Sequence, residues 1–250
     1  MGLTVDLNCD LGEGAGQDEA LMPLITSANI ACGGHAGDAA TMRATLRLAR
    51  RYGVGIGAHP GFEDRINFGR LERPVTPAEV TELVRAQVGA LQQAAAKQGA
   101  AVSHVKLHGA LYNQTARDPD LAAGVIAAIR ALTPGAALVT LAGSVLERLA
   151  RATGDFAVVA EVFADRTYQA SGTLTPRNRP DALIEDPVRA VAQVLRMVRE
   201  GKVQSTEGPD VVIRADTVCL HGDGAQAVGF AQRLRKELAA ADITVRAFAV

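Results

Sequence analysis

Apolar and polar residues alternate in the segment HVKLHGALYN at positions 104–113, which is the period of a β-strand. Val105 and Leu107 form the apolar face of this expected strand. The opposite face holds two imidazoles and an ammonium, from His104, Lys106 and His108. Gly109 ends the strand, so that its last imidazole stands at the carboxyl end, where parallel α/β folds carry their chemistry. An edge strand with its polar face in solvent would show the same alternation.

Strands and helices are expected to alternate from one end of the chain to the other. Apolar residues at helical spacing, preceded by capping residues such as Asp38 and Thr76, predict helices that begin near residues 18, 38, 76, 118, 144, 186 and 224. The expected strands span residues 3–9, 28–32, 54–58, 104–108, 136–141, 156–162, 217–220 and 243–249. Such repeated units imply a parallel sheet with right-handed crossovers. Seven or eight units in 250 residues predict an α/β fold, a closed or slightly deformed (β/α) barrel forming a single domain over residues 1–250.

Composition and charge are typical of a cytoplasmic enzyme or enzyme subunit. The 48% hydrophobic content supports a large core, and the net charge of −1 argues against a nucleic-acid or acidic-membrane surface. No apolar run reaches the length of a membrane span, and the first ten residues lack the basic and apolar regions of a signal peptide. The three cysteines, Cys9, Cys32 and Cys219, form no CxxC motif and suit a reducing compartment.

The expected strand ends gather most of the candidate functional residues. In chain order these are Asp6, Asn8, Asp10, Glu13, His35, His59, Lys106, His108, Glu161, His221 and Asp223. In a parallel barrel the carboxyl ends of the strands converge on one mouth, so these groups are expected to meet there. Four of the five histidines stand at such ends, and His104 lies two residues upstream on its strand.

Each of these residues also has a purely structural interpretation. Asp6 could be a buried partner that holds Lys106, because a buried ammonium needs water or an anionic neighbour. Asp223 could be a helix N-cap, His59 a hydrogen-bonded core histidine, and Glu13 an exposed turn residue. The glycines around this turn are too weakly spaced for a phosphate loop, and no GxxxxGK(S/T) motif occurs in the chain.

A metal site is an alternative interpretation of the histidines. Asp10, His35 and His59 could supply oxygen and imidazole ligands from three strands to zinc or manganese. His104 and His108 lie roughly 13 Å apart on an extended strand, too far for one metal. The His-x-His pair of metal-dependent amidohydrolase barrels is absent, and the site is predicted without a metal.

Two long loops carry arginines over the expected mouth. One spans residues 61–73, and the other spans residues 164–180 and includes Asp165, Arg166 and Arg177. An arginine fork suits a carboxylate or phosphate held by two hydrogen bonds, although most surface arginines are simply solvated. Both loops are therefore candidate lids.

Taken together, these motifs resemble the LamB/YcsF family, the A subunits of prokaryotic ATP-dependent 5-oxoprolinase. The resemblance covers nearly the whole chain, through the blocks DLNCDLGEG (6–14), NIACGGHAGD (29–38), GAHPGFEDRINFGR (57–70), HVKLHGALYN (104–113), EVFADRTYQASGTLTPR (161–177) and LHGD (220–223). It implies a barrel of the glycoside hydrolase/deacetylase kind that cleaves the lactam 5-oxoproline to glutamate. It also implies coupling to ATP hydrolysis, with ATP and Mg²⁺ bound with or by partner subunits B and C.

The chemistry of opening a lactam suggests roles for the candidate residues, whose positions the resemblance supports. Lys106 would neutralise charge that develops on the amide oxygen or on phosphate. General base catalysis would fall to Asp10 or His108, and acid catalysis to His35 or His221. Arg166 would hold the substrate carboxylate. The other expected substrate contacts are Asp6, Asn8, His59, Glu161 and Asp223.

Two other classes of function stay open at this point. The first is a metal-dependent deacetylase or sugar amidase that acts alone on the same barrel. The second is a subunit that binds and presents substrate while its partners carry out the chemistry. The sequence also leaves open where ATP binds and whether the chain forms a homo-oligomer.

Overall fold

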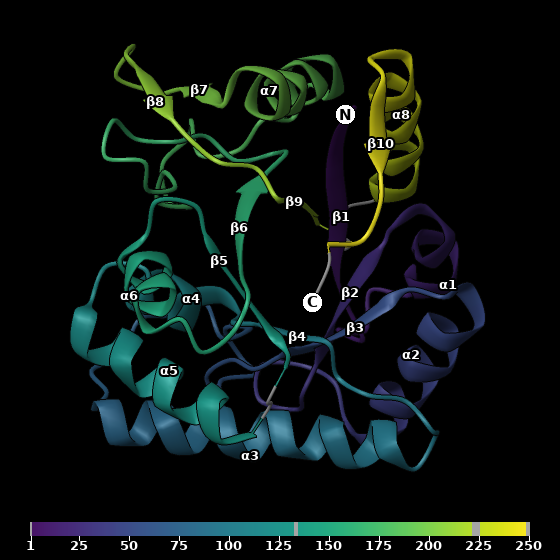
Figure 1. Ribbon diagram of the computed structural model, residues 1–250, viewed down its shortest axis with the longest axis vertical. Helices are drawn as coiled ribbons and strands as arrows, with labels where there is room; N and C mark the ends of the chain where they lie inside the picture. The colour runs from purple at the N-terminus through teal and green to yellow at the C-terminus, as the bar shows by residue number, and fades with distance from the viewer. Residues whose placement is uncertain (1, 133–134, 222–225, 249–250) are drawn as a thin grey trace.

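Seven parallel strands close into a barrel in the computed structural model, which describes residues 2–132, 135–221 and 226–248. Neighbouring strands pair in the order β1-β2-β3-β4-β5-β6-β9, and β9 pairs with β1 to complete the ring (Figure 1). The strands are β1 (Leu3–Leu11), β2 (Ser27–Ala31), β3 (Gly55–His59), β4 (His104–Lys106), β5 (Ala137–Leu141), β6 (Val158–Phe163) and β9 (Thr217–Leu220). The predicted barrel fold is therefore confirmed.

The first strand belongs to two parts of the sheet. Its second half pairs with β2 on one side and with β9 on the other. Its first half pairs instead with β10 (Ile243–Val245), which extends the sheet outside the ring. The eighth strand expected near the end of the chain thus exists, but it lies beside the barrel wall and ends earlier than predicted.

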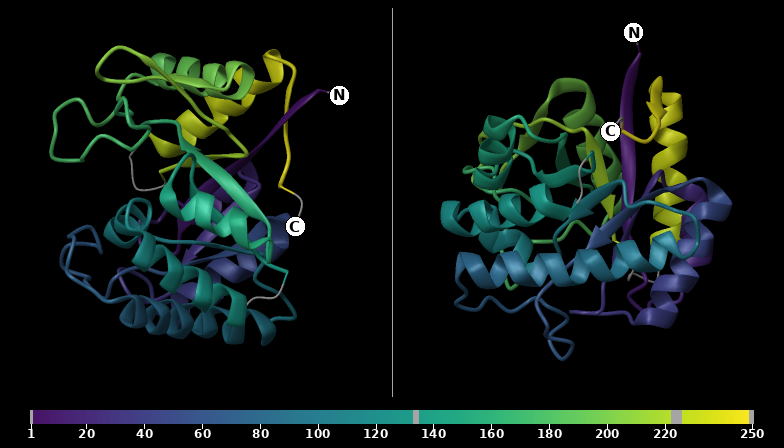
Figure 2. Two further views of the ribbon diagram at one scale, coloured as in Figure 1. Left: turned by 60° about the vertical axis from the view of Figure 1, so that its left-hand side comes forward. Right: turned by 60° about the horizontal axis from the view of Figure 1, so that its bottom comes forward.

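Helices cover the outside of the barrel (Figures 1 and 2). Their bounds are α1 (Asp18–Leu21), α2 (Ala39–Tyr52), α3 (Pro77–Ala96), α4 (Gly109–Thr115), α5 (Pro119–Leu132), α6 (Val145–Thr153), α7 (Pro187–Glu200) and α8 (Ala227–Ala240). The predicted caps are present, since Asp38 accepts hydrogen bonds from the backbone of Ala40 and Thr41, and Thr76 forms a capping box with Glu79. No helix in the described ranges is long and apolar enough to cross a membrane.

Three features differ from the predicted elements. The helix expected from residue 18 ends after one turn, and the chain continues as the 3₁₀ helix η1 (Met22–Leu24), since Pro23 has no amide hydrogen to donate. Helix α4 begins at Gly109, three positions after the end of β4, and was not expected, since Gly109 was predicted only to end the strand. A small antiparallel hairpin, β7 (Lys202–Gln204) with β8 (Asp210–Val212), follows α7 and was not expected from the sequence.

Alternation along the strands separates an apolar outer layer from a polar interior. The outward side chains of β1 pack in the large hydrophobic core under the helices, while Asp6 and Asn8 are buried inside the barrel. The lower interior holds a small apolar cluster of Ala137, Val139 and Val159, against which Phe248 packs. The polar face of the 104–108 segment therefore points inward, and the alternative of a solvated edge strand is wrong.

Helices α3 and α5 pack side by side with close backbone approach at Gly124 (Figure 2). A Cβ atom added to Gly124 would lie 2.5 Å from the backbone oxygen of Pro77. Gly124→Ala is therefore expected to lower the free energy of unfolding by about 1–3 kcal/mol, because the overpacking outweighs the better helix propensity of alanine. Gly89→Ala, in the same helix pair but with open space around its Cβ, should raise stability by about 0.5–1 kcal/mol. Denaturant unfolding of both variants measures the two free energies of unfolding. Equal changes in the two variants would contradict the prediction.

Candidate active site

A pocket opens at the carboxyl ends of the strands, as the strand-end pattern predicted. Its lining includes Asp10, Glu13, His59, Arg70, Lys106, His108, Tyr112, Arg166, Arg177 and His221. Six of the predicted site residues thus meet in one place. Asp6, Asn8, His35 and Glu161 lie outside the lining, and Asp223 lies outside the described residues.

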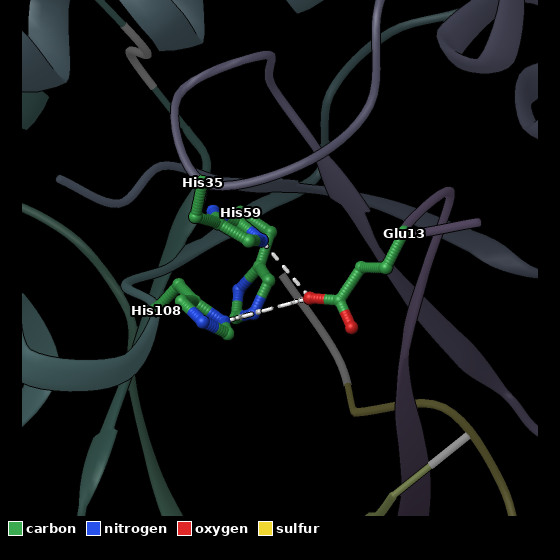
Figure 3. A group of neighbouring side chains, drawn as sticks. All are labelled: Glu13, His35, His59 and His108. Atoms are coloured by element: carbon green, nitrogen blue, oxygen red, sulfur yellow. Dashed lines mark hydrogen bonds and ion pairs between the residues drawn. The ribbon is translucent and has the colours of Figure 1, made fainter. Parts of the chain in front are cut away.

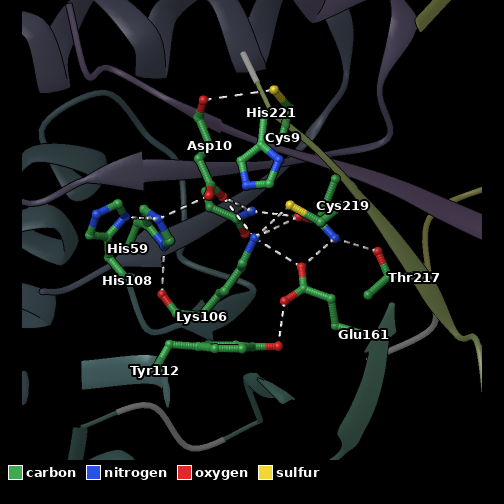
Figure 4. Close-up of polar contacts among 12 residues, drawn as sticks. Cys9, Asp10, His59, Lys106, His108, Tyr112, Glu161, Thr217, Cys219 and His221 are labelled. Carbon is green, nitrogen blue, oxygen red and sulfur yellow. Dashed lines mark hydrogen bonds and ion pairs between the residues drawn. The ribbon is translucent and has the colours of Figure 1, made fainter. Parts of the chain in front are cut away.

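Lys106 forms the floor of the pocket, with its ammonium held between two carboxylates (Figure 4). Nζ lies 2.9 Å from Asp10 Oδ1 and 2.9 Å from Glu161 Oε1. It also lies 3.2 Å from Asn8 Oδ1 and 3.1 Å from Cys219 Sγ. Burial alone would lower the pKa of Lys106, but the neighbouring carboxylates raise it well above its usual value. The side chain is therefore a fixed cation at the end of the pocket.

Asp10, whose side chain is 12% exposed, is an anion in spite of being mostly buried. Burial by itself raises the pKa of Asp10, but the charges of His59 and Lys106 outweigh that effect and hold it well below its usual value. Its Oδ2 lies 3.3 Å from His59 Nε2. The carboxylate of Asp10 therefore contacts both the Lys106 ammonium and the His59 ring.

Glu161 and Asn8 both contact the Lys106 ammonium, and neither residue lines the pocket. Asn8 Nδ2 donates to Glu161 Oε1 at 2.9 Å, and the hydroxyl of Tyr112 donates to Glu161 Oε2 at 2.7 Å. Burial and the neighbouring carboxylate raise the pKa of Tyr112 well above its usual value, so the phenol stays a proton donor. Asn8 and Glu161 were predicted to contact substrate. In the structure they position the Lys106 ammonium.

Asp6 lies deeper in the barrel than predicted and is not the partner of Lys106. Its carboxylate accepts hydrogen bonds from the hydroxyls of Thr26 at 2.6 Å, Ser27 at 2.7 Å and Thr217 at 2.5 Å. Asp6 lies four positions before Asp10 on β1, which is roughly 13 Å along a strand. The structure therefore does not place Asp6 among the residues that could contact substrate.

His104 also lies below the pocket. Its Nε2 is 2.9 Å from Asn29 Oδ1, and the amide of the same asparagine reaches Asp10 Oδ1. Burial, followed by the charges of Lys106 and His59, lowers the pKa of His104 to about 3. The ring is therefore neutral and serves to order the polar interior.

Three histidines and one glutamate meet at the side of the pocket (Figure 3). They follow four neighbouring strands: Glu13 after β1, His35 after β2, His59 at the end of β3, and His108 after β4. Among the described residues, these four side chains form a group whose possible ligand atoms all lie within 4.8 Å of one another. The metal-site alternative named Asp10, His35 and His59; this group contains both of those histidines, with Glu13 and His108 in place of Asp10.

Glu13 is the residue of this group that sequence reasoning left without a role. Its side chain is 8% exposed and its Oε1 lies 2.9 Å from His35 Nε2. Gly12 and Gly14 on either side have φ values of 72° and 88°, which let the chain turn back over the barrel mouth. The Gly-Glu-Gly sequence was the available signal, but it does not tell where the turn points.

His221 forms a second polar group in the lining of the pocket. Its Nδ1 lies 2.7 Å from Asp165 Oδ2, and its Nε2 lies 3.0 Å from Arg177 Nη2. Burial would raise the pKa of Asp165, but His221 outweighs this and lowers it. Because the carboxylate accepts from Nδ1–H, Nε2 carries the lone pair that accepts from the arginine. Neither Asp165 nor Arg177 was predicted as a site residue, although both lie in the predicted 164–180 lid.

Arg166 lines the pocket but much of its guanidinium is used within the loop. Nη2 donates to the backbone oxygen of Thr175 at 2.5 Å, and Nε donates to that of Ala182 at 3.3 Å. Burial, with Arg177 nearby, lowers the pKa of Arg166 to about 10. Its predicted contact with a substrate carboxylate stays a prediction, and Arg177 and Arg70 line the same pocket.

Comparison with known proteins gives a consistent result. The model of the LamB/YcsF family matches residues 5–250. The A subunit of 5-oxoprolinase from Brevibacillus brevis is 51% identical over 249 residues, with 98% of each chain covered. The protein of the same name from Bacillus subtilis is 50% identical, with 97% of this chain and 96% of that protein covered.

Solved structures agree with the barrel fold. A lactam utilization protein from Thermus thermophilus is 44% identical and superimposes with a TM-score of 0.90, covering 98% of this chain and all of that one. A family 4 carbohydrate esterase from Streptomyces lividans has a TM-score of 0.52 over 99% of this chain and 93% of the other; at 13% identity it shows the fold alone. With the family model matched from residue 5 to the last residue, the chain belongs to the LamB/YcsF family.

Proposed function

We propose that this chain is the A subunit of a 5-oxoprolinase, which hydrolyses the lactam 5-oxo-L-proline to L-glutamate with ATP hydrolysis. The curated relatives carry that name, and the solved relative is called a lactam utilization protein. The letter in the name implies further subunits, which we take to be a B and a C subunit that bring ATP and Mg²⁺. The cytoplasmic location inferred from the cysteines stays a prediction; all three are free and buried.

The observation that carries the proposal is the Lys106 ammonium fixed between Asp10 and Glu161 on the pocket floor. A five-membered lactam is a stable amide, and opening it places negative charge on the carbonyl oxygen or on a phosphoryl group attached there. A fixed cation stabilises such charge best when it needs no reorganisation. The two carboxylates hold Lys106 in place before substrate arrives.

The walls of the pocket offer the other groups that this reaction needs. Arg177 and Arg70 are suited to the carboxylate of 5-oxoproline, which would orient the ring toward Lys106. His221, oriented by Asp165, can take a proton from water at Nε2 and return one to the ring nitrogen of the lactam once Arg177, which lies 3.0 Å from Nε2, turns to the substrate carboxylate. The low pKa of Asp10 makes it a weak base, so we assign it to holding Lys106 and His59.

A stand-alone amidase is the second candidate, and the group of Glu13 with three histidines is the observation that favours it. An enzyme of that kind would cleave an unactivated amide without ATP and without partners. A chelator would stop it. These properties separate it from a component of a 5-oxoprolinase complex in one set of assays.

The purified chain alone is expected to form little or no glutamate from 5-oxoproline and ATP. The reason is that the sequence contains no GxxxxGK(S/T) phosphate loop, so the phosphoryl donor has to come with the partners. The measurement is 5-oxoproline-dependent release of phosphate and glutamate for the chain alone, for the B and C subunits alone, and for all three together.

A Lys106→Met chain added to the same B and C subunits is the matched control. Glutamate production by the isolated wild-type chain would contradict the proposal. Full activity of the complex with Lys106→Met would show instead that this chain only binds and presents substrate.

A further inference from the structure

The tautomers of two histidines at the pocket are set by backbone carbonyls. His59 Nδ1 lies 2.8 Å from the carbonyl oxygen of Lys106, and His108 Nε2 lies 2.9 Å from that of Phe68. A carbonyl oxygen only accepts, so each of these nitrogens carries a hydrogen. In the neutral rings, His59 Nε2 and His108 Nδ1 are consequently left with bare lone pairs.

These two lone-pair nitrogens face each other at 2.9 Å. Two acceptors at that distance repel unless a cation lies beside both of them. Backbone carbonyls on the far nitrogens are also the usual partners of histidines that bind a metal, because they orient the ring and make the near nitrogen more basic. The arrangement therefore needs either a proton or a metal ion.

Asp10, Glu13 and His35 surround this gap, and Asp10 Oδ2 lies 3.3 Å from His59 Nε2. Glu13 Oε1 lies 3.5 Å from His108 Nδ1 and 3.8 Å from His59 Nε2, and 2.9 Å from His35 Nε2. The rings of His35 and His108 stack in parallel with centroids 3.6 Å apart, so the edges of both rings face the same carboxylate oxygen. All four side chains are nearly excluded from solvent, at 0–8% exposure.

The spacing fits a small divalent cation. Four ligands at about 2.05 Å in a tetrahedron lie about 3.3 Å from one another. Four of the six separations among these ligand atoms are 2.9, 2.9, 3.5 and 3.8 Å, on both sides of that value, and all six are within 4.8 Å. Three imidazoles and one carboxylate are a donor set suited to zinc and its transition-metal neighbours, and not to calcium or magnesium, which prefer oxygen.

We propose that Glu13, His35, His59 and His108 bind one divalent cation of the zinc class at the side of the pocket. Glu13, His59 and His108 also line the pocket, so the cation would lie in its wall, next to Asp10 and Lys106. This inference does not depend on the function proposed above, because it is tested by metal content and spectra and not by turnover.

The test uses the full chain stripped of metal with a chelator and then titrated with Zn²⁺ by calorimetry and with Co²⁺ by visible absorption. We expect one metal per chain and the intense d–d absorption of four-coordinate Co²⁺. His59→Gln, His108→Gln and Glu13→Gln should each weaken binding at least about 100-fold, more than the loss of an outer-shell partner costs. Glu13 lies in a loop, so its variant tests the site even if a buried histidine variant fails to fold.

His221→Gln is the matched control, a histidine of the same pocket outside the proposed ligand set, and it should bind the metal like the wild type. Less than a tenth of a metal per chain after Zn²⁺ addition would overturn the proposal, as would equal binding by wild type and Glu13→Gln. Histidine ¹⁵N spectra of the metal-free chain show which ring nitrogens carry a hydrogen. If His59 is protonated on both nitrogens and Zn²⁺ changes none of the ring-nitrogen signals of His35, His59 and His108, a proton occupies the gap and the proposal is wrong.

Discussion

Lys106→Met is expected to lower the free energy of unfolding by roughly 3–5 kcal/mol and to remove nearly all turnover of the assembled enzyme. The substitution keeps much of the side-chain volume but leaves Asp10 and Glu161 buried without their shared cation. Unpaired buried carboxylates cost far more than a surface ion pair, because neither water nor a counter-charge replaces the ammonium. Urea unfolding of the isolated chain and glutamate production by the complex measure the two effects.

Lys106→Arg separates the structural role of this residue from its catalytic role. Arginine keeps the charge and should restore most of the lost stability, but its planar fork cannot present a compact ammonium at the same point. We therefore expect stability without turnover. Near-normal turnover would contradict the catalytic assignment while leaving the ion pair intact.

A double variant tests the cause of the instability. Lys106→Met combined with Asp10→Asn removes one of the two carboxylates along with the cation. It should be more stable than Lys106→Met alone, because the residues interact directly and their effects do not add. It should remain inactive. Equal or lower stability would show that the lysine acts by packing and not by charge.

His221→Ala is expected to lower the kcat of the complex by about 100- to 10,000-fold, which is the usual contribution of a general acid or base. The free energy of unfolding should also fall, because the side chains of His221 and Asp165 are only 16% and 29% exposed and Asp165 loses its partner, so kcat is compared per folded chain. Asp165→Asn should lower kcat as well, since the amide no longer favours the tautomer with the hydrogen on Nδ1. The measurement is kcat and its pH profile in the presence of B, C and ATP.

Arg179→Ala is a suitable control for the loop that carries Asp165. Arg179 lies in the same 164–180 segment, is about half-exposed and pairs with Asp181, and it does not line the pocket. It should leave kcat unchanged. A kcat for His221→Ala within about twofold of the wild type would be far below the effect expected of a proton carrier and would remove His221 from the mechanism.

The sequence by itself determined the elements and the side of the barrel on which the chemistry lies. Alternation in a strand is local, so the pattern of 104–108 already placed Lys106 on an inward face. Caps at Asp38 and Thr76 are equally local, since they depend on hydrogen bonds within three residues. The missed helix α4 and hairpin show the limit: Gly109 adopts a φ of 54° and still begins a helix that tertiary packing stabilises.

Only the tertiary structure decided which groups meet. Strands β1 and β4 lie across the barrel from each other, so their relative height follows from closure of the whole ring, and this height pairs Lys106 with Asp10 and not with Asp6. Glu13 reaches the histidines because two glycines with positive φ turn its loop inward, and Asp165 reaches His221 across 56 residues of chain. Periodicity fixes the face of a strand on which a side chain lies. Which residue that side chain contacts follows from the stagger of the strands and the direction of the loops. Both are set by contacts between residues far apart in the chain.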